Sequence, residues 1–246
     1  MRWLWFLIAV ILVGAGYYFW QNKSMDNSLK LRLTASDGVK IAYDYYKPDS
    51  SASGPDKFFV LVHMMPATKE SWKEFAELAK AKGHVSIAID LRGHGQSEGG
   101  PDGYKNFSDA EHQASIKDVE AAVKFVLDKG AKPEKITLAG ASIGANLVLQ
   151  YLAEHPEIKK AVLFSPGLDY RGIKGDDLMK KLSEGQRVWL VAADDDNNGL
   201  NSQWVRELYD LVPNNVERRG VTFKVGGHGT DIFKTIPELM EKFIGF

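Results

Sequence analysis

Cysteine is absent from the 246 residues of this chain. That absence excludes disulfide bonds, a thiolate nucleophile and a zinc site with cysteine ligands. An excess of charge is missing as well, because 31 lysines and arginines nearly balance 32 aspartates and glutamates. No basic stripe runs along the chain, so the sequence predicts no nucleic-acid partner. Internal repeats and low-complexity tracts are also absent, which excludes a repeat architecture.

The composition is that of an ordinary globular protein. Apolar residues make up 44% of the chain and charged residues 26%, which allows a sizeable core. Residues 1–24 stand apart from this pattern, and we expect them to form a membrane anchor or signal segment with its linker. The remaining residues, 25–246, are enough for one large α/β domain.

The N-terminal segment is apolar and uncharged from residue 3 to residue 20. Its length is near the lower limit for a helix that spans a bilayer. Trp3 and Trp5 at one end and the aromatic residues 17–20 at the other resemble the aromatic belts of a membrane interface. We therefore favour a hydrophobic helix that anchors the protein by a single N-terminal span, in an undetermined orientation. The alternative is a signal peptide cleaved near residues 13–15, followed by export.

Short apolar runs alternate with helix-like runs over the rest of the chain. The first two strands predict an antiparallel hairpin, and repeated strand–helix units follow it. This order predicts a mostly parallel central sheet with helices on both faces, and catalytic groups on loops at the carboxyl ends of its strands. The expected strands are residues 29–33, 39–46, 58–62, 85–90, 135–139, 161–164, 188–192 and 221–225, and the expected helices are residues 70–82, 109–128, 145–153, 203–211 and 231–243.

Residues 140–144, Gly-Ala-Ser-Ile-Gly, carry the strongest functional signal. They lie between an apolar run and a helix-like run, which is the setting of a G-x-S-x-G nucleophile elbow. Small residues are needed there because the turn is tight and its backbone crowds the neighbouring strands. Ser142 is expected at the tip of the turn, at the positive end of the following helix. It is our candidate nucleophile.

A serine hydroxyl needs a base to take its proton, and an acid must orient that base. After such an elbow the chain order is Asp or Glu and then His. Only His155 and His228 follow Ser142. His155 is expected at the far end of the helix that Ser142 begins, where the helix dipole favours a histidine. His228 lies among glycines just past the last strand, and we predict that it is the base.

The acid is expected among Asp194, Asp195 and Asp196, which follow a predicted strand. The usual spacing from a small residue at the strand end is three, and counting from Ala193 gives Asp196. Asp195 is the alternative if counting begins one residue earlier. The other two aspartates are interpreted as part of a solvated loop.

Together these segments resemble the serine hydrolases of the α/β-hydrolase fold. The resemblance runs from about Leu31 to the C-terminus, and it includes Val62-His63, the Asp-Leu-Arg-Gly-His-Gly-Gln-Ser run at residues 90–97, the elbow, the three aspartates and residues 227–231. It implies an oxyanion hole formed by the backbone N–H groups of Ile143 and Met65. Family members commonly have glycine after the histidine, whereas this chain has Met64, which does not easily take a glycine-only conformation.

The resemblance also implies structural roles for His63 and His94, which hold loops by hydrogen bonds. A metal site made of His63, His94 and Asp90 has the wrong spacing for a known motif. We therefore expect no metal and no cofactor.

Many relatives insert a helical lid after the strand that follows the elbow helix. Here only about two dozen residues, 165–187, lie in that region, and residues 176–183 are the one candidate for a short helix. We expect a minimal lid and an open pocket, as in compact dienelactone-hydrolase-like and small esterase members. Members with a cysteine nucleophile are excluded.

The expected function is hydrolysis of carboxylic esters or thioesters of small molecules, through a Ser-His-Asp triad and an acyl-enzyme intermediate. One alternative is acyl transfer to an acceptor other than water, with the same residues. A second is a membrane-tethered binding domain that has kept the fold without activity, since fold alone does not give function. The triad residues in their expected chain order argue against this second alternative.

Overall fold

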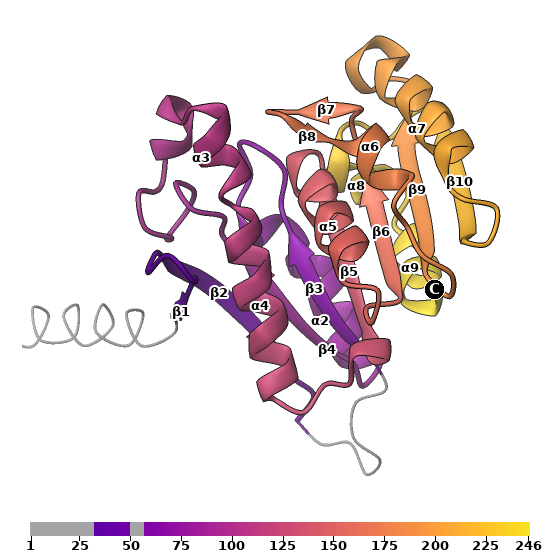
Figure 1. Cartoon of the computed structure of the whole chain (residues 1–246). Helices are drawn as coiled ribbons and strands as arrows, with labels where there is room; N and C mark the ends of the chain where they lie inside the picture. The colour runs from indigo at the N-terminus through magenta and orange to yellow at the C-terminus, as the bar shows by residue number, and fades with distance from the viewer. Residues whose placement is uncertain (1–31, 50–56) are drawn as a thin grey trace, which may run out of the picture. The chain divides into compact units, whose positions relative to one another are not determined.

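A computed structural model describes residues 32–49 and 57–246. Within them, eight strands form one sheet in the order β1-β2-β4-β3-β5-β6-β9-β10, and β7 pairs with β8 in a separate hairpin (Figure 1). The strands of the sheet are β1 Arg32–Thr34, β2 Lys40–Tyr46, β3 Phe58–Val62, β4 Val85–Ile89, β5 Ile136–Ala141, β6 Lys160–Phe164, β9 Arg187–Ala193 and β10 Glu217–Phe223. The hairpin consists of β7 Asp169–Tyr170 and β8 Ile173–Lys174.

The sheet is mostly parallel, as the sequence predicts. Strand β2 runs antiparallel to β4, and every pairing from β4 through β3, β5, β6 and β9 to β10 is parallel. The register places Val62 of β3 beside Gly140 of β5, and Phe164 of β6 beside Ala141 and Val191. The carboxyl ends of these strands therefore lie side by side, which brings the loops after them together.

Helices cover both faces of the sheet. Helices α4 and α5 pack on one face, and α2 and α9 on the other (Figure 1). The α-helices are α2 Lys73–Ala81, α3 Asp109–Gln113, α4 Ile116–Asp128, α5 Ile143–Glu154, α6 Gly175–Met179, α7 Leu200–Leu211, α8 Ile232–Thr235 and α9 Glu238–Gly245. Short 3-10 helices lie at η1 Lys69–Trp72, η2 Gly103–Asn106, η3 Pro133–Lys135, η4 Asp196–Gly199 and η5 Gly229–Asp231.

Strand β3 shows how the sequence builds two cores. Successive side chains of a strand point to opposite faces, so a strand covered on both sides must be apolar throughout. Val60 and Val62 join the core under α4 and α5, whereas Phe59 and Leu61 join the core under α2 and α9. Phe59 makes edge contacts with Phe75 and Phe243, at centroid distances of 5.2 and 5.4 Å. Burial of such a ring contributes about 1.5–3 kcal/mol.

Two expected helices are interrupted in the structure. The helix expected over residues 109–128 is divided into α3 and α4, because Ser115 and Asp118 make tighter backbone bonds to residues three positions earlier. The helix expected over residues 231–243 is divided into α8 and α9. Pro237 causes this division, because a proline disfavours the helical conformation in the residue before it. Ile236 accordingly has φ −132° and ψ 69°.

Strand β10 begins earlier than the sequence pattern indicates. Its first residues, Glu217, Arg218 and Arg219, are charged, so they do not form the apolar run that indicates a strand. They are tolerated because β10 is the edge of the sheet, where charged side chains reach solvent.

The predicted apolar helix at residues 3–20 lies outside the residues that the structure describes. Among residues 32–49 and 57–246, no helix combines the length and apolarity needed to cross a bilayer. The anchor and the cleaved signal therefore both stay predictions, as does the boundary between residues 24 and 25.

His63 fastens the loop after β3 to the loop after β4. Its Nε2 accepts a hydrogen bond from the backbone N–H of Leu91 at 3.0 Å, and its Nδ1 lies 2.9 Å from the carbonyl oxygen of Met64. These partners require a neutral ring with the proton on Nδ1. The side chain is fully buried beside His94, and burial lowers the pKa of His63 to about 3. Both ring nitrogens are thus committed to the backbone.

We predict that His63 makes the fold sensitive to acid. The unfolded chain binds a proton at this residue near its ordinary pKa of 6.5, whereas the folded chain binds one only near pH 3. The stabilising effect of the neutral ring is therefore complete above pH 6.5 and is lost as the pH falls toward 3. Over this window the wild type should lose up to about 1.4 kcal/mol of unfolding free energy per pH unit more than His63→Gln.

Urea unfolding of both proteins at several pH values measures this difference. Equal slopes for the wild type and His63→Gln would contradict the prediction.

Candidate active site

Ser142 occupies a strained turn between β5 and α5. Its backbone has φ 54° and ψ −121°, a conformation that residues with a side chain rarely adopt. The flanking glycines are required by direct backbone contact. A Cβ on Gly140 would lie 2.1 Å from the carbonyl oxygen of Gly144, and a Cβ on Gly144 would lie 2.6 Å from the carbonyl oxygens of Val62 and His63. The turn thus has the strand–turn–helix form of a nucleophile elbow.

The first turn of α5 begins directly at Ser142. The carbonyl oxygen of Ser142 accepts hydrogen bonds from the N–H groups of Ala145 and Asn146. The N–H group of Ser142 donates to the carbonyl oxygen of Phe164 at the end of β6. The N–H of Ile143 lies at the helix N-terminus, where the first donors of a helix have no partner within it. Such a donor beside a nucleophile can hold a developing oxyanion.

Met65, the second predicted oxyanion donor, lies in the loop after β3. That loop packs against the elbow, because the carbonyl oxygens of Val62 and His63 are the atoms that exclude a side chain at Gly144. Neither Met64 nor Met65 has a positive φ. The backbone at this position therefore has a conformation that methionine can adopt, although family members commonly have glycine there.

His228 and Asp196 form a close pair. Both carboxylate oxygens of Asp196 lie 2.9 Å from Nδ1 of His228, and the Asp196 side chain is buried. This contact places the ring proton on Nδ1 and leaves Nε2 as the nitrogen that can accept another proton. Asp196 follows β9 and His228 follows β10, so the parallel pairing of these edge strands brings the two loops together.

The neighbouring aspartates behave differently from each other. Oδ1 of Asp195 accepts bonds from the N–H groups of Gly226 and Gly227, each at 3.0 Å. Asp195 is exposed, as expected of a solvated loop, and it also holds the loop that carries His228. Asp194 has an exposed side chain, and its backbone N–H donates to Phe223.

Ser165 connects the parts of the site, and the sequence patterns did not single it out. Its hydroxyl donates to Oδ2 of Asp196 at 2.7 Å and accepts from the N–H of Gly229 at 2.9 Å. Ser165 follows β6, the strand between those that carry Ser142 and Asp196, and its φ is 48°. Its position at a strand end was the available signal, because polar groups at neighbouring strand ends converge.

Asn201 and Tyr170 complete the polar surroundings of the site. Nδ2 of Asn201, a buried residue of α7, lies 3.3 Å from Nδ1 of His228. The Tyr170 hydroxyl donates a hydrogen bond to the carbonyl oxygen of Ser165, 3.4 Å away, and lies near the side chains of Ser142 and Asn201. Sequence reasoning missed both residues because contacts between distant segments leave no local pattern.

Ser142 and His228 lie on adjoining loops. A Cβ on Gly229, the residue after His228, would lie 3.0 Å from the side chain of Ala141, the residue before Ser142. Among the described residues, no hydrogen bond joins Ser142 to His228. Such bonds are often long before substrate is bound. His155 is at the far end of α5, where its ring stacks on Tyr151.

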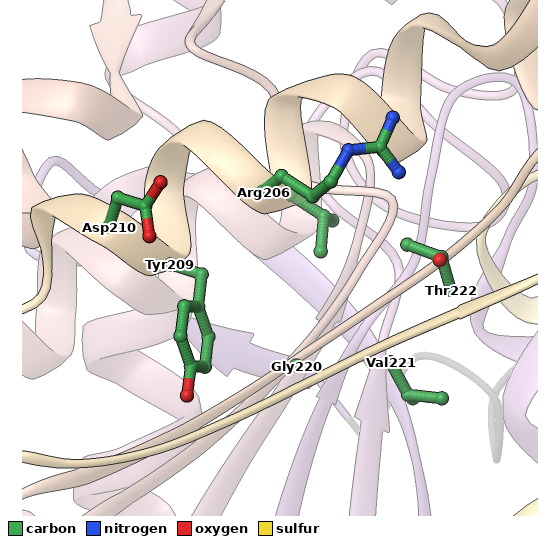
Figure 2. A pocket seen from close by; sticks show the side chains of 7 residues that line it. Arg206, Tyr209, Asp210, Gly220, Val221 and Thr222 are labelled. Atoms are coloured by element: carbon green, nitrogen blue, oxygen red, sulfur yellow. The ribbon is translucent and has the colours of Figure 1, made fainter.

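A separate hollow of about 310 Å³ lies between α7 and the edge strand β10. Arg206, Tyr209 and Asp210 border it from the helix, and Val221 and Thr222 border it from the strand (Figure 2). It contains none of the predicted catalytic residues.

Comparison with known proteins supports the assignment of the fold. The chain is 33% identical over 135 residues to a bifunctional esterase/perhydrolase of Acinetobacter calcoaceticus, covering 54% of this chain and 43% of that protein. It is 25% identical over 143 residues to a probable alcohol acetyltransferase of Wickerhamomyces anomalus, covering 55% of this chain and 38% of that protein. The chain thus spans less than half the length of these relatives.

Among solved structures, an esterase from Exiguobacterium antarcticum superposes with a TM-score of 0.67 at 14% identity, covering 88% of this chain and 99% of that one. This likeness shows the α/β-hydrolase fold. A family model described as serine aminopeptidase, S33, matches residues 53–243 and includes Ser142, Asp196 and His228. The chain therefore belongs to the serine aminopeptidase S33 family and has the α/β-hydrolase fold.

Proposed function

We propose that this protein is a serine hydrolase that cleaves carboxylic esters or thioesters of small molecules. The observation that carries the proposal is the pair of buried Asp196 and partly exposed His228, which lies on the loops next to a strained elbow serine. A histidine held by a buried carboxylate on one nitrogen can act as a base with the other. Ser142 and Ser165 both have a positive φ, but the Ser165 hydroxyl is already bonded to Asp196 and Gly229, which leaves Ser142 as the candidate nucleophile.

In the proposed mechanism His228 takes the proton of Ser142 while the serine oxygen attacks the substrate carbonyl. The resulting oxyanion is bound by the N–H groups of Ile143 and Met65. His228 then returns the proton to the leaving alcohol or thiol, and the acyl group stays on Ser142. A water molecule, activated by His228, releases the acid and regenerates the serine. Asp196 keeps the imidazole oriented and stabilises its positive charge.

The segment between β6 and β9 supports small substrates. It contains only the β7–β8 hairpin and the short helix α6, and no longer helical insertion covers the elbow. We therefore expect the site to be open compared with relatives that have a full lid. Several relatives and structural neighbours are esterases, which favours ester over amide substrates.

Acyl transfer is the second candidate, and the similarity to a probable alcohol acetyltransferase favours it. The two reactions share the acyl-enzyme and differ in the acceptor that attacks it. Adding an alcohol to a nitrophenyl ester assay distinguishes them. A hydrolase should release mainly free acid, whereas a transferase should form mainly the new ester at modest alcohol concentration.

We predict that Ser142→Ala abolishes turnover and leaves folding nearly unchanged. Loss of the nucleophile should lower kcat by about 10⁶-fold, because only substrate binding and oxyanion stabilisation remain. Hydrolysis of short nitrophenyl esters measures the activity, and a fluorophosphonate probe should label the wild type at Ser142 alone. A variant that keeps more than a tenth of the activity would rule out this mechanism.

We predict that Asp196→Asn lowers kcat by up to ~10⁴-fold, because an amide cannot stabilise the imidazolium and favours the wrong ring tautomer. Two matched controls lie beside it. Asp194→Asn alters an exposed side chain, and Asp195→Asn keeps an oxygen that can accept from Gly226 and Gly227. Both controls should stay within about tenfold of wild type by the usual size of single hydrogen-bond changes. A larger loss in Asp195→Asn than in Asp196→Asn would assign the acid to Asp195 instead.

A further inference from the structure

Ser165 is the first residue after β6, and it is almost completely buried. Its backbone N–H donates to the carbonyl oxygen of Val191 in β9 at 2.7 Å, and its carbonyl oxygen accepts from the Tyr170 hydroxyl at 3.4 Å. Its φ is 48°, a value at which residues with a side chain are uncommon. The backbone of Ser165 is therefore held in an unfavourable conformation against β9, the strand that Asp196 follows.

Glycine would suit this backbone better than serine. Glycine adopts a positive φ without steric cost, and the chain uses it in this way at Gly227 and Gly229 on the loop of His228. A side chain that persists at such a position points to a need for its chemistry, because strained conformations gather at functional sites. For Ser165 that chemistry is a hydroxyl, and both of its hydrogen bonds lead to the proposed acid–base pair.

The direction of these two hydrogen bonds is fixed by their partners. The backbone N–H of Gly229 can only donate, so the Ser165 oxygen is the acceptor at 2.9 Å. The single hydrogen of the hydroxyl is then left for Oδ2 of Asp196, at 2.7 Å. Both oxygens of Asp196 also lie 2.9 Å from Nδ1 of His228. Because His228 and Gly229 are consecutive in the chain, these bonds close a ring through all four residues.

We propose that Ser165 is a positioning residue for the acid–base pair: its hydroxyl fixes the carboxylate of Asp196 against the loop of His228, so that the imidazole keeps one orientation through the reaction. This inference rests on the proposed function. Ser165 keeps its proton throughout and acts on the reaction only through Asp196 and His228. When His228 becomes positively charged, the bond from Ser165 keeps the carboxylate opposite it, because hydrogen bonds to ionised acceptors are roughly twice as strong as neutral ones.

Asp195 fixes the same loop in a different way. Its Oδ1 accepts from the N–H groups of Gly226 and Gly227, which precede His228, and its side chain is exposed. Ser165 is buried and holds the residue after His228. Among the described residues, Ser165 is the side chain that hydrogen-bonds both the backbone of this loop and Asp196. Loss of its hydroxyl therefore releases the loop and the carboxylate together.

The proposal predicts that Ser165→Ala and Ser165→Gly both lower kcat and leave KM nearly unchanged. We expect a loss of about 10–100-fold, the range that corresponds to a hydrogen bond with a charged group. Ser165→Gly relieves the strained backbone, so it should be as slow as Ser165→Ala if the hydroxyl is what matters. Ser86→Ala is the matched control, because Ser86 of β4 is fully buried and its hydroxyl has no hydrogen-bond partner within the part of the chain that the structure describes.

The experiment measures steady-state hydrolysis of nitrophenyl acetate and the rate of inactivation by a fluorophosphonate, in full-length wild type, both Ser165 variants and Ser86→Ala. Ser165→Ala is also combined with Asp196→Ala, which removes the carboxylate through which the hydroxyl acts. Changes in residues that share one network are not additive. Ser165→Ala should therefore slow the inactivation of Asp196→Ala much less than that of the wild type. This result, with low kcat in both Ser165 variants and unchanged kcat in Ser86→Ala, would support the proposal.

Four results would overturn the role of Ser165: wild-type turnover in either Ser165 variant, a rise in KM with unchanged kcat, a comparable loss in Ser86→Ala, or equal losses with and without Asp196. The proposed function would stand in each case, provided that the fluorophosphonate labels the wild type at Ser142. Absence of that labelling would instead overturn the proposed function, and the role of Ser165 with it. If Ser165→Ala does not fold, Ser165→Gly supplies the same comparison, because glycine suits the backbone at this position.

Discussion

The close approach of three backbone segments at the elbow is the constraint on which the rest of the site depends. Gly144 lies directly against the carbonyl oxygens of Val62 and His63, and Gly140 against the carbonyl oxygen of Gly144. No side chain separates β5, α5 and the loop after β3. The unfavourable backbone conformation of Ser142 persists because its neighbours leave the chain no other path. The same contact sets where the loop with Met65 passes the serine.

Hydrogen bonds to buried charged side chains fix the positions of the adjoining loops. Oxygens of Asp90 accept bonds from the N–H groups of Lys69 and Gln96, each at 2.8 Å. Arg92 donates to Asp118 through its guanidinium group and through its backbone N–H. Such bonds satisfy polar groups that could not otherwise be buried, and they fix loops that have few apolar side chains of their own. Hydrogen bonds of Asp90 and Arg92 thus explain much of the Asp-Leu-Arg-Gly-His-Gly-Gln-Ser run by loop architecture.

The sequence revealed those parts of the site that rest on local rules. The elbow follows from the steric demand of one turn, and His228 from its glycine loop after a strand. Ser165 and Tyr170 gave no such signal, because they lie near Asp196 and Ser142 only through a sheet order that brings distant segments together. The same holds for Asp195, whose acceptor role depends on where the next loop passes. The broken C-terminal helix was different, since Pro237 was a visible signal that apolar periodicity obscured.

The strand order also determines when the site can exist during synthesis. The serine turn is complete once β3, β5, α5 and β6 have formed, but the proposed acid and base follow β9 and β10, which are translated later and add to one edge of the sheet. A nascent chain therefore has its elbow serine without the proposed proton acceptor until the 64 residues from the end of β6 at Phe164 to His228 have been added. Addition of the charged edge strand completes the sheet and the Asp196–His228 pair together, so the proposed reactivity would arise only in a molecule whose central sheet has already been assembled.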